Sequence, residues 1–249
     1  MKRKLLNAIT IQDINQSEAE IYIHGNIIDD SYDKYFWSDD EKSGYVLPID
    51  VRKQLENVKD KDLTIYINSD GGMVSAGIAI ANMISRHKGH TTAIIDGWAA
   101  SIASVIFMAA DTRKMPGNTW LMIHKPMIQM TGNADDLQRG VSFLDTIQAG
   151  IEETYMSRAK EGVTPEQVHD MVNAETWMTA QEAAEIFDIE VTEEQMEAAA
   201  CAGVISNVFK HVPENLLNSP IFQKEGVPQP KKDTAKQRAF ILKALADSK

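Results

Sequence analysis

Two strand–turn–helix units in the first half of the chain constrain its fold more than any other sequence feature. Each begins with a short β-rich strand, passes through a turn containing glycine, and continues into an apolar helix. In chain order, the predicted elements are a strand at 63–68, a helix at 75–87, a strand at 91–96, a helix at 101–110 and a strand at 120–124. Such alternation is typical of α/β architecture with parallel neighbouring strands.

The segments on either side of these units complete the predicted organisation. An alternating strand is expected at 19–28 and a helix at 46–58. A long amphipathic helix is expected over 133–160, and capping signals at Thr164 and Thr179 begin two further helices. The predicted divisions are an N-terminal arm (1–18), a central domain (19–195) and a flexible C-terminal linker that can form one last helix (196–249).

The composition excludes several classes of protein. The chain has 249 residues, 43% of them hydrophobic, which is enough for one sizeable α/β domain with extensions or for two small domains. A net charge of −11 argues against general nucleic-acid binding, although the tail from Cys201 carries eight Lys/Arg against four Asp/Glu. With Cys201 as the single cysteine, no internal disulfide is expected and a reducing, cytoplasmic compartment is favoured. We expect neither a signal peptide nor a membrane span, since no apolar segment approaches the roughly 20 residues of a span.

The second glycine turn carries a serine that is well placed for nucleophilic attack. Gly97-Trp98-Ala99-Ala100-Ser101 follows a strand and opens an apolar helix, so the hydroxyl of Ser101 lies at a strand-to-helix junction. Backbone N–H groups at the helix start point to the same place, and the small Ala99 and Ala100 leave room for a substrate backbone. This is the logic of a nucleophile elbow without its usual sequence. The alternative is that Ser101 only caps the helix, and this segment taken alone favours the cap.

A base and an acid for this serine can be sought further along the chain. His124 ends the predicted strand at 120–124. A lone histidine at a strand end is more often structural, but histidine is also the commonest base for a serine nucleophile. The base in turn needs a carboxylate to orient it. Glu175, which lies beside a large aromatic and just before a capping box, and Asp170 are the two candidates.

Four motifs together carry a resemblance to a known family. They are Ile-Asn-Ser-x-Gly-Gly after the strand at 63–68, then Gly-x-Ala-Ala-Ser, then Met-Ile-His-x-Pro, and finally a Trp-Met-Thr-Ala run that opens a capped helix. Over residues 19–193 the sequence resembles the ClpP peptidase family, and more closely the ClpP-related head-maturation (prohead) proteases of tailed phages and prophages. Each motif is weak by itself, whereas four in register are specific.

The resemblance implies a role for each matching residue. Ser101 aligns with the nucleophile, and His124 aligns with the general base that later protonates the leaving amine. Gly72 and Ile102 align with the residues whose backbone N–H groups form the oxyanion hole. Glu175 stands where ClpP usually has Asp, so the resemblance implies that Glu175 is the triad acid.

Several positions depart from the family pattern or leave an alternative open. Asp170 remains the alternative acid and would fit only if its helix were placed differently. Asp70 replaces the proline usual in the first glycine turn, which is expected to loosen the turn and to bring a charge near the oxyanion hole. Phe187 replaces a helix-terminating glycine, so the turn there is expected to differ, because a bulky residue is costly at positive φ.

The resemblance also implies an architecture and partners. The expected fold is an α/β, ClpP/crotonase-type spiral of β-β-α units with a helical handle at 133–160, where the family makes its ring-to-ring contact. Homo-oligomeric rings, single or stacked, are expected. Polypeptide substrates are expected to bind as an added strand beside residues 127–130. The resemblance implies no metal ion, no organic cofactor, and neither nucleic acid nor membrane as a partner.

The expected function is a serine endopeptidase that works through an acyl-enzyme and processes phage scaffold or capsid precursors. Its place would be the cytoplasm of a bacterium or of a phage-infected host cell. One alternative is the proteolytic subunit of an ATP-dependent Clp protease that works with an AAA+ unfoldase. A second is a catalytically silent ring used as an assembly component. A third is a crotonase acting on acyl-CoA, which would not need Ser101 and His124 together.

Overall fold

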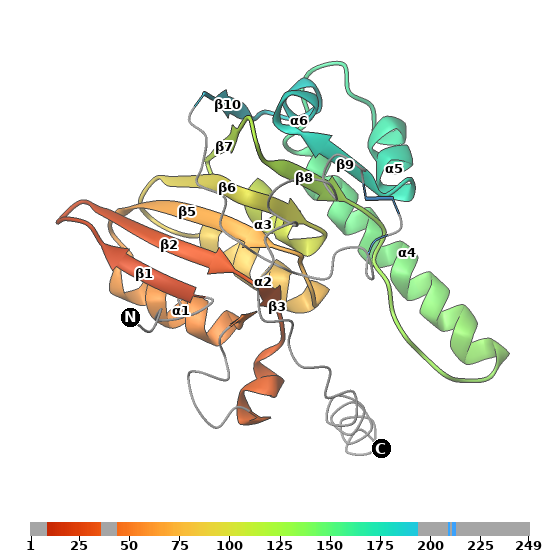
Figure 1. Ribbon diagram of the computed structural model, residues 1–249. Helices are drawn as coiled ribbons and strands as arrows, with labels where there is room; N and C mark the ends of the chain where they lie inside the picture. The colour runs from red at the N-terminus through yellow and green to blue at the C-terminus, as the bar shows by residue number, and fades with distance from the viewer. Residues whose placement is uncertain (1–8, 36–43, 194–208, 210, 213–249) are drawn as a thin grey trace, which may run out of the picture.

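The computed structural model describes residues 9–35, 44–193, 209, 211 and 212, in which a mixed sheet is covered by helices (Figure 1). The strands of the large sheet are β1 Ile9–Asp13, β2 Glu18–His24, β5 Asp62–Ser69, β6 Thr91–Ala100, β7 Thr112–Pro116, β8 Trp120–Ile123, β9 Thr176–Thr179 and β10 Glu190–Thr192. Their order is β1-β2-β5-β6-β7-β10, with β8 paired to β6 and β9 paired to β8. Strands β3 (Asn26–Ile27) and β4 (Tyr45–Val46) form a separate small sheet. The pairs β1–β2 and β8–β9 are antiparallel and the other pairs are parallel.

Strand β6 changes partner along its length. Its first half pairs with β7 at 92–94, and its last residues pair with β8 at 98–100. The register against β5 shifts near the change, and a Cβ on Gly97 would lie only 2.7 Å from Asn68 Oδ1. Glycine therefore permits a close approach at the point where β6 leaves the main sheet. As a result, β6 ends beside β8 rather than beside β7.

Helices lie below the sheet and to one side of it. They are α1 Pro48–Asn57, α2 Val74–Ser85, α3 Ile102–Met108, α4 Ala134–Met156, α5 Pro165–Asn173 and α6 Ala180–Ile186, with a 3-10 turn over Asp30–Tyr35. Helices α1, α2 and α3 lie beneath the strands, and α4 projects away from them as a long handle (Figure 1). Helices α5 and α6 flank β9 near the base of α4 (Figure 1).

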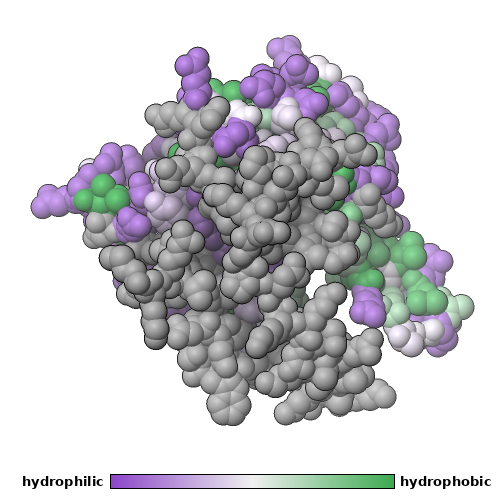
Figure 2. All heavy atoms as spheres, in the orientation of Figure 1, coloured by the Kyte–Doolittle hydropathy of each residue, from purple (hydrophilic) through white to green (hydrophobic). Residues whose placement is uncertain are grey.

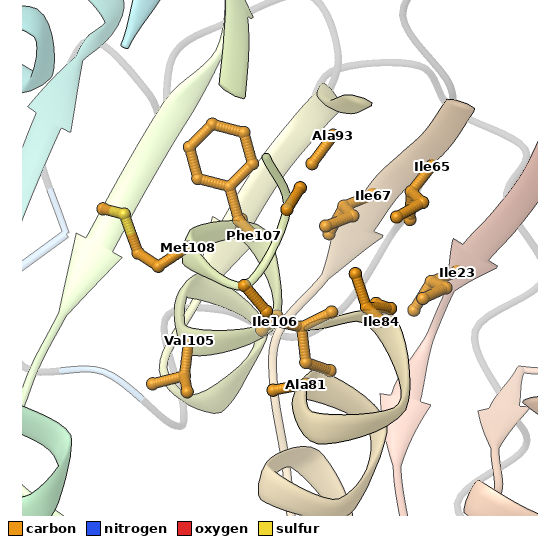
Figure 3. Close-up of a cluster of buried hydrophobic side chains, with 14 of the residues drawn as sticks. Ile23, Ile65, Ile67, Ala81, Ile84, Ala93, Val105, Ile106, Phe107 and Met108 are labelled. Carbon is orange, nitrogen blue, oxygen red and sulfur yellow. The ribbon is translucent and has the colours of Figure 1, made fainter. Parts of the chain in front are cut away.

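Alternation along the strands builds the main core. Side chains at every second position of the central strands are buried, namely Ile21, Ile23, Leu63, Ile65, Ile67, Ala93 and Ile95. They face Ile84 of α2 and Ile106 and Phe107 of α3 (Figure 3). Each buried Ile or Leu side chain among them contributes about 1.5–3 kcal/mol. The layer formed by α2 and α3 is thereby fixed beneath the strands, and with it the helix that follows Ser101.

A second apolar cluster lies on the other face of the β6–β8 pair. Strand residues alternate between faces, so Trp98, Ala100 and Met122 point away from the main core that Ala99, Leu121 and Ile123 join. Phe209, from far along the sequence, is 5% exposed and packs among them. We call this set the tryptophan cluster; its members are Trp98, Ala100, Met122 and Phe209, bordered by Trp120, Trp177 and Val212.

The predicted fold class is confirmed, and the helices predicted within the described residues are present with ends shifted by a few residues. The possible last helix of 196–249 lies outside the described residues. Five strands lie outside those predicted from the sequence, namely β1, β4, β7, β9 and β10. Strand β7 contains Arg113, Lys114 and Pro116, which do not read as an apolar strand, yet Arg113 is 3% exposed and donates to Ala110 O and Asp188 O. Strand β9 lies inside the run that was expected only to introduce a capped helix.

The structure describes residues on both sides of the predicted central domain, in the predicted N-terminal arm and in the predicted C-terminal linker. Strand β1 lies within the predicted arm 1–18 and pairs with β2. Within the predicted linker 196–249, the structure describes Phe209, His211 and Val212, and the remaining linker residues lie outside the described part. The division itself stays a prediction.

Two local expectations concerned the turn at Phe187 and the segment 127–130. After α6, Phe187 adopts φ −115° and ψ 159° and is fully buried, so the chain leaves the helix extended and needs no positive φ. Residues 127–130 form no strand within the described chain. They run beside α4 instead, since a Cβ on Gly140 would lie 2.3 Å from Met130 Sδ. The role of 127–130 as the substrate-side strand stays a prediction.

Exposed apolar side chains gather on the handle. They are Leu137, Val141 and Phe143 of α4 with Met127, Ile128 and Met130 of the preceding segment. Figure 2 shows a hydrophobic region where the handle projects. Among the described helices, none combines the length and the apolar character that crossing a membrane requires.

The core prediction can be tested at Ile67, which is 0% exposed. We expect Ile67→Ala to lower the free energy of unfolding by about 2–5 kcal/mol, because it removes buried methyl groups and leaves a cavity. The matched control is Ile14→Ala, at a side chain that is 49% exposed, which should change it by less than about 0.5 kcal/mol. Urea denaturation followed by circular dichroism measures both. Equal losses in the two variants would contradict this description of the core.

Candidate active site

Ser101 follows β6 directly and has a backbone conformation unusual for a residue with a side chain. Its φ is 55° and its ψ is −130°, which is outside the left-handed region that non-glycine residues sometimes adopt. Its N–H donates to the Met122 carbonyl at 3.0 Å, so β8 holds it in place. Ser101 is the N-cap residue of α3, but its side chain makes no capping hydrogen bond. The hydroxyl is therefore not used as a helix cap. Strain of this kind costs about 1–3 kcal/mol and is concentrated at functional sites.

His124 lies beside this hydroxyl. Its Nε2 is 2.7 Å from Ser101 Oγ, a hydrogen-bond distance, across 23 residues of sequence. Burial lowers the pKa of His124 below its ordinary value, and the charge of Glu175 acts in the opposite direction. The lowered pKa keeps the imidazole neutral near pH 7, and only the neutral form can accept a proton from a serine.

Glu175 is brought to His124 by the pairing of β8 with β9. Ile123 pairs with Thr176 in the antiparallel register, so His124 and Glu175 are the next residues facing each other. Glu175 also has a positive φ of 54°. One of its carboxylate oxygens, Oε1, accepts the backbone N–H of His211 at 2.7 Å. Asp170, the alternative acid, is exposed on α5.

The Gly71-Gly72 turn lies against the start of α3. A Cβ on Gly71 would be 2.7 Å from the Ser101 Cβ and 3.1 Å from the Ile102 nitrogen. Ile27 donates its N–H to the Gly71 carbonyl and accepts the N–H of Met73. The Gly71 carbonyl and the Gly72 N–H belong to one trans peptide group and point in opposite directions, so the Gly72 N–H points away from Ile27.

Ile102 offers a second backbone donor beside the serine. It is the first residue of α3, and the N–H groups of a first helical turn have no acceptor within the helix. The N–H of Ser101 itself is already bonded to β8. Gly72 and Ile102 therefore flank Ser101 as two candidate donors.

Asp70 behaves differently from the expectation of a loosened turn. Its Oδ1 accepts the indole N–H of Trp98 at 2.7 Å, which ties the turn to β6. The neighbouring Ser69 adds bonds from its hydroxyl to the Gly25 carbonyl and from the Gly71 N–H to its Oγ. Burial raises the pKa of Asp70, and the bond from Trp98 partly offsets that rise.

Sequence reasoning missed two sets of residues near Ser101. The hydroxyls of Ser104 and Tyr155 are 2.7 Å apart, and Ser104 Oγ also bonds to the Ser101 carbonyl, linking the handle to the nucleophile turn. Tyr155 was visible only as one apolar position of a long amphipathic helix. Phe209 and His211 lie in a tail whose sequence carries no motif, so no local signal could have placed them here.

No group of three or more His, Cys, Asp or Glu side chains that could hold a metal ion occurs in the part of the chain that the structure describes. The Ser101 hydroxyl, the His124 imidazole and the Glu175 carboxylate form a series in space, with two backbone donors beside the hydroxyl. Such an arrangement can support nucleophilic attack on a carbonyl carbon.

A sheet that forks at β6, a handle helix and a serine–histidine pair at a strand-to-helix junction define a ClpP-like α/β protein. The profile of the Clp protease family matches residues 52–187, which is more than half of the chain. The chain therefore belongs to the Clp protease family.

Individual relatives agree with this membership. The ATP-dependent Clp protease proteolytic subunits of Streptococcus pneumoniae strains Hungary19A-6 and CGSP14 are each 32% identical over 127 residues, covering 50% of this chain and 65% of their own length. The matched region thus spans less than two thirds of these relatives. A mutant ClpP1 from Listeria monocytogenes aligns with a TM-score of 0.56 at 26% identity, covering 71% of this chain and 92% of that chain.

The bond between Asp70 and Trp98 generates a stability prediction. Asp70→Ala leaves the indole N–H of Trp98, which is 1% exposed, without its acceptor. We expect a loss of about 1–3 kcal/mol in the free energy of unfolding. Asp70→Asn keeps an acceptor oxygen and should retain most of that stability. Chemical denaturation measures the loss in both variants. An equal loss in Asp70→Ala and Asp70→Asn would contradict the assignment of the stability to an acceptor oxygen for the Trp98 N–H.

Proposed function

We propose that this protein is a serine endopeptidase that hydrolyses peptide bonds through an acyl-enzyme on Ser101. The observation that carries the proposal is the 2.7 Å hydrogen bond between His124 Nε2 and the hydroxyl of a serine in a strained backbone conformation. A helix cap would need neither the strain nor the histidine. Membership of the Clp protease family supports the same reaction.

The roles follow from the order of the groups. His124 accepts the hydroxyl proton as Ser101 Oγ attacks the scissile carbonyl, and it then gives that proton to the leaving amine. Glu175 orients the imidazole and stabilises its protonated form. The N–H groups of Gly72 and Ile102 stabilise the negative charge on the carbonyl oxygen. Water then repeats the sequence on the acyl-enzyme, again with His124 as base.

The proposal also includes where substrates bind and how copies of the chain assemble. Polypeptide substrates bind as an added strand along 127–130, a segment beside His124 whose Met127, Ile128 and Met130 are exposed. Further copies of the chain cover the apolar side chains of the handle and form a ring. Exposed apolar side chains of this number support an interface there.

The natural substrate separates two forms of the proposal. The Glu-Thr-Trp run around Glu175 favours a head-maturation protease that cuts scaffold or capsid precursors in the cytoplasm of a bacterium or phage-infected host, without an unfoldase. The curated relatives are named ATP-dependent Clp protease proteolytic subunits, which favours an AAA+ partner. Cleavage of a folded substrate that requires ATP and a Clp unfoldase supports the second form and excludes the first.

Labelling with a fluorophosphonate probe tests the reaction. Wild type should react with the probe, and Ser101→Ala should lose all labelling of the nucleophile. His124→Ala should slow the reaction by roughly 10⁴–10⁶-fold and Glu175→Ala by up to about 10⁴-fold. Asp170→Ala, the matched control at the exposed carboxylate of α5, should retain the wild-type rate. If wild type reacts no faster than Ser101→Ala, the peptidase proposal is wrong. If Asp170→Ala loses labelling rate and Glu175→Ala does not, Asp170 is the acid.

The lowered pKa of His124 predicts a pH profile. Activity requires neutral His124 and is lost as the pH falls through its pKa, which burial depresses. The acid limb of kcat/KM should therefore have its midpoint below about 6.5, the ordinary histidine value. Because the charge of Glu175 raises the pKa of His124, Glu175→Gln should move the midpoint lower still. A midpoint that rises in Glu175→Gln would contradict this electrostatic description.

A further inference from the structure

Three described residues of the C-terminal part, Phe209, His211 and Val212, lie at the candidate active site although they come from a distant part of the sequence. Two of these side chains, Phe209 and Val212, join the tryptophan cluster. His211 lies between them and bonds to Glu175 and Ala174. The two faces of the β6–β8–β9 sheet explain why these residues meet catalytic groups there. Residues at alternate positions share a face, so His124 shares its face with Met122, and Glu175 shares that face with Trp177.

Phe209 packs against the base. Its ring lies edge-on to the imidazole of His124, with 5.6 Å between centroids and 82° between planes. It makes a similar contact with Trp177, at 5.6 Å and 80°. Such edge-to-face pairs have a defined geometry and limit ring rotation. Phe209 thus contacts the imidazole while Nε2 keeps its hydrogen bond to Ser101.

His211 contacts the acid through its backbone. Its N–H donates to Glu175 Oε1 at 2.7 Å, and its ring nitrogen Nδ1 lies 3.0 Å from the Ala174 carbonyl. A hydrogen bond from a backbone donor to a charged oxygen is short and directional. The second contact fixes the His211 backbone beside the strained Glu175. The carboxylate is therefore oriented by a donor that belongs to the tail.

We propose that Phe209, His211 and Val212 form a positioning element of the active site, in which Phe209 confines the His124 imidazole and the His211 amide orients the Glu175 carboxylate. The proposal rests on the proposed serine peptidase function. It assigns a role to residues that lie outside the matched region 52–187 of the family profile. The contacts described for these three residues fall on the base, the acid, the neighbouring Ala174 carbonyl and the tryptophan cluster, and they leave the bond between Ser101 and His124 in place. That arrangement is expected of a support for the catalytic groups rather than of a segment that occupies the nucleophile.

The first test separates the His211 amide from its side chain. His211→Pro removes the N–H and should lower the rate of fluorophosphonate labelling by about 10²-fold, the loss expected from a misplacement of about 1 Å. His211→Ala keeps the N–H and gives up only the bond to Ala174, so its loss should stay below about tenfold. With a peptide substrate the loss in His211→Pro should appear in kcat rather than in KM. Equal rates in the two variants, or a faster reaction in His211→Pro, would overturn the proposal, and the faster reaction would identify the three tail residues as an inhibitory cover.

The second test follows the His124 imidazole itself and does not depend on activity. In the full-length Ser101→Ala background, NMR titration of His124 is compared with and without Phe209→Ala. Burial lowers the pKa of His124, so removing the covering ring should raise that pKa toward its ordinary value. Phe209→Leu, which keeps an apolar cover, should restore most of the difference.

Other titratable groups near this face must be separated from the effect of Phe209. They are Glu175 from the β9 side, Asp70 bound to Trp98, and the His211 ring, and the His211→Ala variant removes the last of these. An unchanged His124 pKa in Phe209→Ala overturns the role of Phe209. Wild type that fails to label, combined with a His124 pKa that does shift, refutes the peptidase function and leaves the packing of the tail on His124 intact. Wild type that labels, with no effect of either tail variant, refutes the tail proposal alone.

Discussion

The change of partner along β6 is the constraint on which the rest of the structure depends. A strand that stayed paired with β7 to its end would leave no place for β8, and Ser101 would have no strand to fix its N–H. Because β6 turns toward β8 at Gly97, the serine N–H meets the Met122 carbonyl. The helix that follows is held under the sheet by the main core. The nucleophile turn is therefore fixed from both sides.

The same fork creates a second face with a core of its own. On that face the apolar side chains of β6 and β8 form the tryptophan cluster, while their neighbours join the main core. The base and the acid continue the two strands whose side chains line this cluster. The same two strands thus both form the tryptophan cluster and place the base and the acid, and the described tail residues contribute to both.

Much of this arrangement could be predicted from the sequence, because it depends on local patterns. Strand alternation, helix periodicity and glycine turns identified the central elements, and four motifs in register brought Ser101 together with His124. Strand β7 could not be predicted, since Arg113 and Lys114 break the apolar pattern of a buried strand. The Arg113 guanidinium is bonded to the nearby Ala110 and Asp111 carbonyls and to the distant Asp188, whose contact no local pattern shows. The bond between Asp70 and Trp98 and the contacts of Phe209 and His211 join residues about 30 or more positions apart. Contacts between residues so far apart leave no periodic pattern in the sequence.

The two non-glycine residues with positive φ in the described chain are Ser101 and Glu175. They are the first and last members of the proposed catalytic series, and each is held in a conformation that a glycine would adopt more easily. Replacing either with glycine would relieve the backbone at the expense of the reaction. At these two positions, folding stability and catalytic activity therefore place opposite demands on the residue. A substitution there that stabilises the fold is expected to lower the activity.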